Sequence, residues 1–163
     1  NNKNTVLTAK RVAAMSSKKI WVINSKTIPE GIAVAKSFNP EYTPEKNFEN
    51  MERSAGEILS GAVTFAAKDG NLNGRFFSHG QIIGLAGEKI ICVGDDIESA
   101  AAKTVFYLLE KANKKRVTLI YGKDTDSYNA EKVSNIVLAR CNDVEIEQIA
   151  GGQSLYYYII SVE

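Results

Sequence analysis

The last thirteen residues constrain the fold most, because a Gly151-Gly152 break is followed by an aromatic and β-branched run that continues to Glu163. Runs of Tyr, Ile and Val favour β-strands. A chain end frays in water unless it is docked, and this one is too apolar to be a loose tail. We therefore predict that residues 156–162 form a docked strand and that a domain ends with the chain.

Length and charge exclude several classes of protein. The 163 residues suffice for one domain or two small lobes. A formal net charge of +1 gives no field that would attract nucleic acid or an acidic membrane. We expect no signal peptide, and no apolar run approaches the roughly 18 residues that span a bilayer. Cys92 and Cys141 are far apart, which favours free buried thiols in a cytoplasmic protein.

The first sixty residues predict helices around one strand. Residues 4–16 have a weak helical pattern, and residues 19–24 (KIWVIN) are typical of a buried parallel strand. Thr27 and Glu30 fit a capping box that opens a helix to about Phe38. Thr43-Pro44 opens a second helix. The chain starts without Met in a loop-like NNKN segment, so we expect it to be part of a longer protein.

The remaining residues alternate between strands and helices. The turn residues of segment 69–74 are expected to join a hairpin. Asp95 or Asp96 is expected to cap one helix, and Ala130, Val133, Ile136 and Val137 to face inward from another at 126–141. Strands are expected at residues 63–67, 81–86, 89–93, 117–121, 144–149 and 156–162. We predict an α/β protein with two lobes: a β/α fragment at 1–59, whose first strand is missing, and a mixed-sheet α/β lobe at 60–163.

Motifs for catalysis and metal binding are absent from the sequence. It contains no phosphate-binding loop, no dinucleotide fingerprint and no nucleophile elbow. One histidine and two distant cysteines do not make a zinc site. His79, in a turn between two expected strands, is the single candidate for a base or a carbonyl-binding group. It has no adjacent carboxylate, so a surface turn residue is the favoured interpretation.

Two loops have the composition of a small-anion site. Ser25, Lys26 and Thr27 follow the expected strand at the edge where open α/β sheets bind ligands. Asn1, Asn2 and Lys3, in the NNKN loop at residues 1–4, would occupy the neighbouring edge if a strand preceded them. Both loops combine amide or hydroxyl groups with one lysine. Helix capping and loop hydrogen bonding are the simpler explanation of the same residues.

Several segments, taken in order, resemble one known family. They are NNKN at 1–4, TIPEG at 27–31, SFNP at 37–40, SGAVT at 60–64, LIYGKD at 119–124 and the tail. The chain resembles the C-terminal domain of the ATP-binding subunit of fatty acid kinase (FakA), of the dihydroxyacetone kinase-like family, which is similar to DegV-like (EDD-like) proteins. It departs from the family pattern in three places. The proline and strand before NNKN are missing, Ser154 and Tyr157 replace two prolines, and the region of His79 differs.

The resemblance implies a bacterial, cytoplasmic protein of lipid metabolism in which different domains bind ATP and the fatty acid carrier. ATP and Mg²⁺ are expected on an absent N-terminal domain, so this part alone is predicted to be inactive as a kinase and to need no cofactor. It would dock a DegV-like fatty acid-binding protein, beside the other domains of the parent kinase. Arg75, Phe76 and Phe77 are candidate partner contacts, unless the aromatic residues lie in the core.

Two alternatives to this function stay open. The chain could be a DegV-like domain that binds a lipid or small anion by itself, through the loops that contain Asn1–Lys3 and Ser25–Thr27. It could also be the dihydroxyacetone-binding domain of a glycerone kinase-like enzyme that uses His79.

Overall fold

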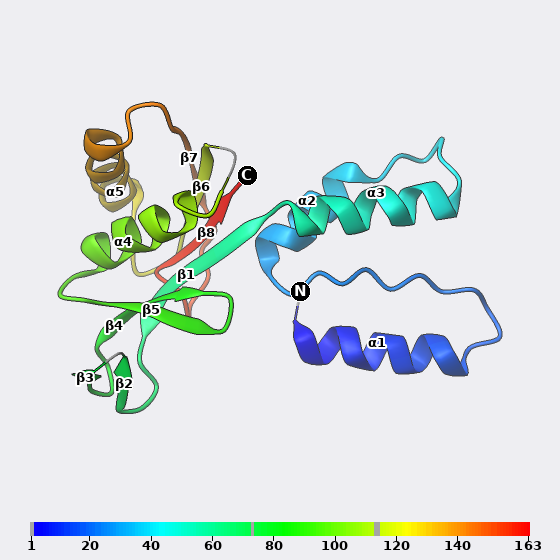
Figure 1. Cartoon of the computed structure of the whole chain (residues 1–163), viewed down its shortest axis with the longest axis horizontal. Helices are drawn as coiled ribbons and strands as arrows, with labels where there is room; N and C mark the ends of the chain where they lie inside the picture. The colour runs from blue at the N-terminus through cyan, green and yellow to red at the C-terminus, as the bar shows by residue number, and fades with distance from the viewer. Residues whose placement is uncertain (1, 73, 113–114) are drawn as a thin grey trace. The chain divides into compact units, whose positions relative to one another are not determined.

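The computed structural model describes residues 2–72, 74–112 and 115–163, and it divides the chain into two compact units, Asn1–Ile58 and Leu59–Glu163 (Figure 1). We call them the first and the second unit. Asn1 itself and residues 73, 113 and 114 lie outside the described residues. The expectation that separate domains meet near residue 59 stays a prediction.

The described part of the first unit contains three helices, and each begins after an N-cap residue. Asn2 caps α1 (Lys3–Met15), Thr27 caps α2 (Ile28–Ser37) and Thr43 caps α3 (Pro44–Gly56). The helices α2 and α3 pack on one another. Buried Asn47 bonds in both directions to the loop between them, because its amide donates to the Asn39 carbonyl oxygen and its oxygen accepts from the Asn39 N–H.

The prediction of a strand at residues 19–24 is wrong. These residues form an extended loop outside any sheet. Side chains of α3 hold it instead: Glu52 accepts the Asn24 N–H at 2.5 Å, and Glu45 pairs with the Lys19 ammonium at 2.6 Å. A strand needs a neighbour for its backbone groups, and the described part of the first unit contains no second strand.

The second unit is a sheet with two helices, plus a small hairpin. The elements are β1 (Leu59–Phe65), β2 (Gly70–Leu72), β3 (Arg75–Phe77), β4 (Ile82–Ala86), β5 (Lys89–Gly94), α4 (Ile97–Leu109), β6 (Arg116–Tyr121), α5 (Ser127–Arg140), β7 (Glu145–Ala150) and β8 (Tyr158–Val162). The α/β class is confirmed. The stretch expected to be only a turn, residues 69–74, contains β2, which pairs with β3 in a separate two-stranded sheet, and neither of these strands was predicted.

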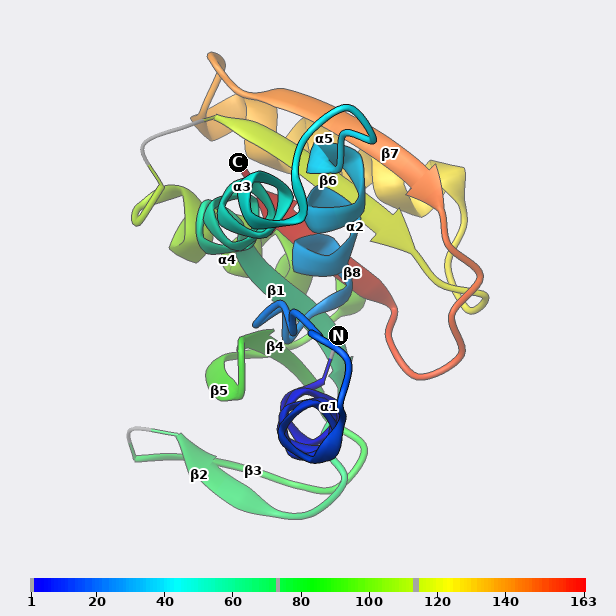
Figure 2. The same cartoon turned by 90° about the vertical axis from the view of Figure 1, so that its right-hand side faces the viewer.

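The six-stranded sheet has the order β5-β4-β1-β8-β6-β7, which can be followed in Figure 2. Pairing is mixed, as predicted: β6 and β7 are parallel, and every other neighbouring pair is antiparallel. It follows that β1, β5, β6 and β7 run in one direction, so their carboxyl ends lie at one edge of the sheet. We call this the carboxyl edge. The tail strand β8 lies in the middle, between β1 and β6.

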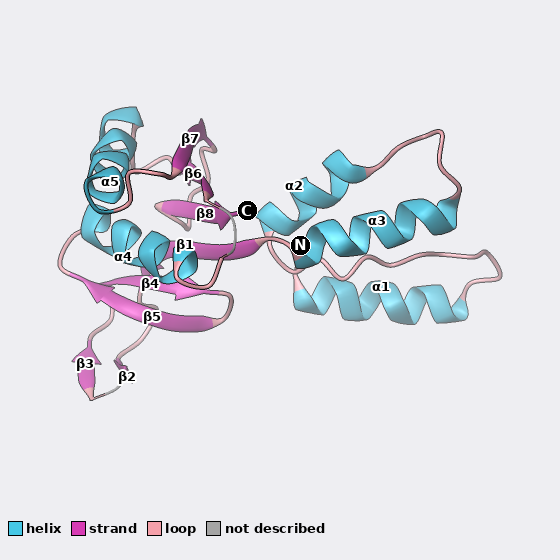
Figure 3. Ribbon diagram, turned by 45° about the horizontal axis from the view of Figure 1, so that its top comes forward, coloured by secondary structure: helices cyan, strands magenta, loops and turns pink. Residues whose placement is uncertain are grey.

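Both long helices of the second unit cover one face of its sheet (Figure 3). Val105 of α4 and Val133 and Val137 of α5 pack with Tyr158 and Ile160 of β8. Ile136, predicted to face inward, is 42 % exposed. The reason is that α5 rests on the sheet along one narrow stripe, so a residue one position before Val137 points away from it.

No helix within the described ranges is long and apolar enough to cross a bilayer. The cysteines also follow expectation in part. Cys92 and Cys141 are free thiols, but they are half-buried rather than fully buried.

Candidate functional site

The N-terminal candidates, Asn2 and Lys3, lie at the beginning of α1. The Asn2 side chain accepts the Asn4 N–H at 2.8 Å, which makes it a helix cap. Lys3 is exposed in the first turn. Asn1, the third member of this group, lies outside the described residues.

The second loop is organised by the capping box of α2. The Thr27 hydroxyl accepts the Glu30 N–H, and the Glu30 carboxylate accepts the N–H groups of Lys26 and Thr27. Ser25 is buried and Lys26 is exposed. Capping accounts for the Thr27 side chain, as it does for Asn2.

The structure brings the two N-terminal loops together. The beginning of α1 and the segment before α2 lie side by side in all three views of the chain (Figures 1, 2 and 3). Two helix N-termini at one place favour an anion, since their N–H groups carry partial positive charge. Whether an anion binds there stays a prediction, because the caps already use several of these donors.

His79 occupies the exposed turn between β3 and β4, as its sequence context predicted. Its backbone N–H donates to the Asp69 carboxylate at 2.7 Å, which fixes the turn. Within residues 2–72, 74–112 and 115–163, no group of three or more His, Cys, Asp or Glu side chains could hold a metal ion.

The candidate partner contacts lie on the β2–β3 hairpin and separate into two kinds. Phe76 is 82 % exposed, whereas Phe77 is 7 % exposed and packs with Ala66, Ile83 and Val93. Phe77 is therefore a core residue and not an exposed contact. Arg75 pairs with Leu72 through its backbone, and its side chain lies outside the described part.

Gly70 explains how the hairpin is attached. A Cβ atom at this position would lie 2.4 Å from the Phe77 ring, so only glycine leaves room for that ring beneath the hairpin. Neighbouring residues of a strand point to opposite faces. The ring that anchors the hairpin thus forces its neighbour Phe76 into solvent.

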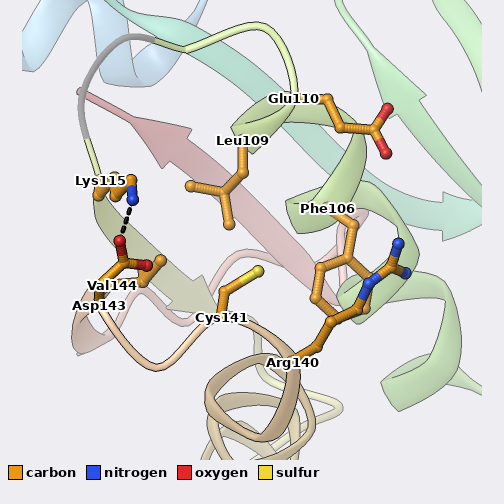
Figure 4. Close-up of a pocket in the computed structure, with 8 residues that line it drawn as sticks. All are labelled: Phe106, Leu109, Glu110, Lys115, Arg140, Cys141, Asp143 and Val144. Carbon is orange, nitrogen blue, oxygen red and sulfur yellow. Dashed lines mark hydrogen bonds and ion pairs between the residues drawn. The ribbon is translucent and has the colours of Figure 1, made fainter.

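A shallow pocket of about 210 Å³, which the sequence did not indicate, lies between the C-terminal ends of α4 and α5 (Figure 4). Its lining consists of Phe106, Leu109, Glu110, Lys115, Arg140, Cys141, Asp143 and Val144. The residues come from two helix ends and the loops beside them, so no local motif could have revealed it.

Three of the four charged side chains that line this pocket are already engaged. Lys115 forms an ion pair with Asp143, and this hydrogen bond lowers the pKa of the Asp143 carboxyl. The Arg140 guanidinium lies over the Phe106 ring, 4.6 Å from its centre. Pockets for small-molecule ligands usually hold about 300 Å³ or more. This pocket therefore suits a single apolar side chain better than a cofactor.

Comparison with known families gives a match over the whole chain. The model of the FakA-like C-terminal family, which describes the C-terminal part of fatty acid kinase proteins of the FakA type, matches residues 1–163. The resemblance inferred from the ordered sequence segments is confirmed by this match.

Curated relatives are longer than this chain. Protein YloV of Bacillus subtilis is 30 % identical over 163 residues, which are 100 % of this chain and 29 % of YloV. An uncharacterized protein of Staphylococcus epidermidis is 31 % identical over the same length, again 29 % of that protein. The chain thus spans less than a third of the length of these relatives.

A solved structure has a similar fold. The crystal structure of a DegV family protein from Ruminococcus gnavus, refined with vaccenic acid, covers 97 % of this chain, and the chain covers 65 % of it, with a TM-score of 0.57. Only 16 % of the residues are identical, so the likeness concerns the fold alone.

Proposed function

The chain belongs to the FakA-like C-terminal family, and on this premise we propose that it is a non-catalytic docking module of a fatty acid kinase. In this proposal it holds a DegV-like fatty acid-binding protein, so that a separate ATP-binding domain phosphorylates the acyl carboxylate. The observation that carries the proposal is the family match from the first residue to the last.

The module would contribute positioning rather than chemistry. Phosphoryl transfer depends mainly on alignment of the reacting groups and on stabilisation of charge at the phosphate. In our proposal ATP and Mg²⁺ bind to a domain outside this chain, and the chain itself holds the acyl carrier near that domain. We place the module in the cytoplasm, in line with its two free cysteines.

Exposed Phe76 is the hairpin contact that we propose for the partner. Aromatic side chains dominate many interfaces because one residue buries a large area at little entropic cost. Phe76 stands 82 % exposed on a hairpin that is anchored by buried Phe77. A ring held in water in this way is available to a partner.

Titration calorimetry with the DegV-like fatty acid-binding protein of the same organism tests the proposal. We expect saturable binding that survives in the 163-residue chain without the ATP-binding domain. Absence of binding at partner concentrations of tens of micromolar would refute docking.

A second candidate function is lipid or small-anion binding by the chain itself. It is favoured by the vaccenic acid in the DegV family structure and by the two helix N-termini at α1 and α2. Native mass spectrometry of the purified chain tests this candidate. A retained fatty acid would support it, and a bare protein mass after expression would count against it.

A further inference from the structure

We propose that the carboxyl edge of the second unit is the main docking surface, and that it takes a basic, partly apolar surface of a protein partner. This inference rests on the proposed function and specifies where and by what chemistry docking occurs. The apolar members of the surface are Phe65, Tyr128, Leu155 and Tyr156. The acidic members are Asp95, Asp96, Glu98, Asp124 and Asp126.

Residues distant in sequence meet at this edge. The loops after β6 and after β7 lie side by side in Figure 2, and the Lys123 N–H donates to the Gln153 carbonyl oxygen at 3.0 Å. The Asn129 amide of α5 donates to the Glu98 carboxylate of α4 at 2.8 Å, which joins the first turns of the two helices. The loops and helix starts that carry the acidic and the apolar members therefore lie together at this edge.

The loop before β8 is held rigidly although it is exposed. Thr64 donates to the Leu155 carbonyl oxygen at 2.7 Å, and Thr125 donates to the Tyr157 carbonyl oxygen at 3.1 Å. The Gln153 amide donates to the Ile120 carbonyl oxygen at 2.9 Å. Side chains on a fixed loop lose little further entropy on binding, which favours an interface.

The apolar members are too exposed to serve the core. Tyr128 and Leu155 are each 64 % exposed, and Phe65 and Tyr156 are exposed to a smaller degree. Three of them are aromatic, and two of these are tyrosines, a residue type enriched at the energetic centres of interfaces. A cluster of exposed apolar side chains with a polar rim marks an interaction site.

Acidic side chains at the same edge determine the sign of the charge that a partner surface must carry. Five carboxylates gather there against Lys123 and Lys132, and Lys132 already lies over the Tyr128 ring, 4.4 Å from its centre. Such a surface repels the phosphates of nucleic acid and attracts a basic protein surface.

Tyr158 places a buried hydroxyl beneath the same edge. Its side chain is 0 % exposed, and its hydroxyl has no hydrogen-bond partner in the structure. Burial and then the charges of Glu98 and Asp126 raise the pKa of Tyr158, so the hydroxyl lies near the first turns of α4 and α5. The acidic members Glu98 and Asp126 are therefore close to the end of β8 that lies at the carboxyl edge.

Two variants test the surface in calorimetric titrations with the same fatty acid-binding protein. The double variant Tyr128→Ala/Leu155→Ala should weaken binding about thirtyfold, as loss of central interface anchors does. Asp124→Lys should weaken it about tenfold at low salt, and the difference should shrink as ionic strength rises because surface charges are screened. Asp124 is an exposed loop residue, so this variant keeps the fold.

Matched controls lie away from the carboxyl edge. Leu138→Ala removes an exposed apolar side chain from the last turns of α5, and Glu110→Lys reverses a charge at the C-terminal end of α4. Both should bind as the unmodified chain does. Unchanged binding by the edge variants, with loss of binding in Phe76→Ala, would overturn the inference and leave the proposed function standing. Failure of the unmodified chain to bind would refute both the docking surface and the proposed docking function.

Discussion

Two apolar segments, residues 19–24 and β8 (Tyr158–Val162), have similar strand propensity and different structures. All five residues of β8 are buried, and β1 and β6 pair with it on either side. Residues 19–24 are extended but outside a sheet, and Ile20 is 45 % exposed. Side chains of α3 hold this segment by one backbone hydrogen bond and one ion pair.

The difference teaches that a strand is defined by its neighbours more than by its own residues. β-Propensity mostly measures how well a side chain fits a pleated, half-buried surface. β8 receives that surface from β1, β6, α4 and α5, whereas the described first unit supplies only helices around residues 19–24. Substitutions in and around the two segments test this contrast, and the largest effect is expected within β8.

Ile160→Ala should reduce the free energy of unfolding of the second unit by about 2–5 kcal/mol, because it leaves a cavity at the centre of the sheet. Ile20→Ala is the matched control and should cost about 1 kcal/mol or less in the first unit. Urea unfolding measures both, with Trp21 fluorescence reporting the first unit and circular dichroism the whole chain. Equal losses would mean that residues 19–24 are as tightly packed as β8.

Gly122→Ala should cost about 1–3 kcal/mol, because its Cβ would lie 2.3 Å from the Tyr156 carbonyl oxygen and 2.6 Å from that of Gln153. The loop that leads the tail into β8 would have to move. Gly56→Ala at the end of α3 is the control: a Cβ there meets nothing within 4 Å, and helix propensity predicts a gain of up to about 1 kcal/mol. Thermal unfolding of the two variants should shift in opposite directions.

Thr27→Ala should destabilise the first unit by about 1 kcal/mol, since the capping box of α2 loses its hydroxyl acceptor. Thr27→Ser keeps that acceptor and should retain most of the stability. Urea titration followed by Trp21 fluorescence measures the change. An alanine variant as stable as the parent would show that the capping box does not stabilise the start of α2.

Tyr158→Phe should change stability by no more than about 1 kcal/mol, and in the stabilising direction, because it removes a buried hydroxyl without a partner. The pKa of Tyr158 is raised in the folded protein. The stability that this raised pKa contributes is therefore fully present below the unfolded tyrosine pKa of about 10. It declines as pH rises above that value, since the unfolded state releases the proton first. The variant should lose stability less steeply than the parent above about pH 10.

Exposed Tyr156 provides the control for this pH effect. Tyr156→Phe should leave the alkaline slope of stability as it is in the parent. A Tyr158→Phe variant with the parent's slope would contradict the shifted pKa.

Local sequence signals predicted the ends of elements well. Thr27, Asp96 and Asp126 each cap the helix expected after them, because a capping bond joins residues only two or three positions apart. Gly87 provides the positive-φ turn between β4 and β5. These interactions involve few residues, so a short stretch of sequence contains all the information that they need.

Which side chains face inward was less predictable. Phe76 and Phe77 are identical neighbours on one strand, and only the position of Ala66, Ile83 and Val93 decides that Phe77 is the buried one. Ile136 fits the apolar stripe of its helix, yet the sheet lies under Val133 and Val137 instead. A periodic pattern shows that an element has two faces, but the packing partner selects between them.

The sequence by itself determined most element types, the caps, the family and the tail as a docked strand, all of which depend on local pattern or ordered segments. Only the tertiary structure decided that β8 lies between β1 and β6 and that residues 19–24 stay unpaired in this fold. It alone gathers Phe65, Tyr128 and Leu155 at the carboxyl edge. The physical reason is that strand neighbours and surface clusters join residues far apart in the chain, and closing those loops depends on the packing of the whole unit.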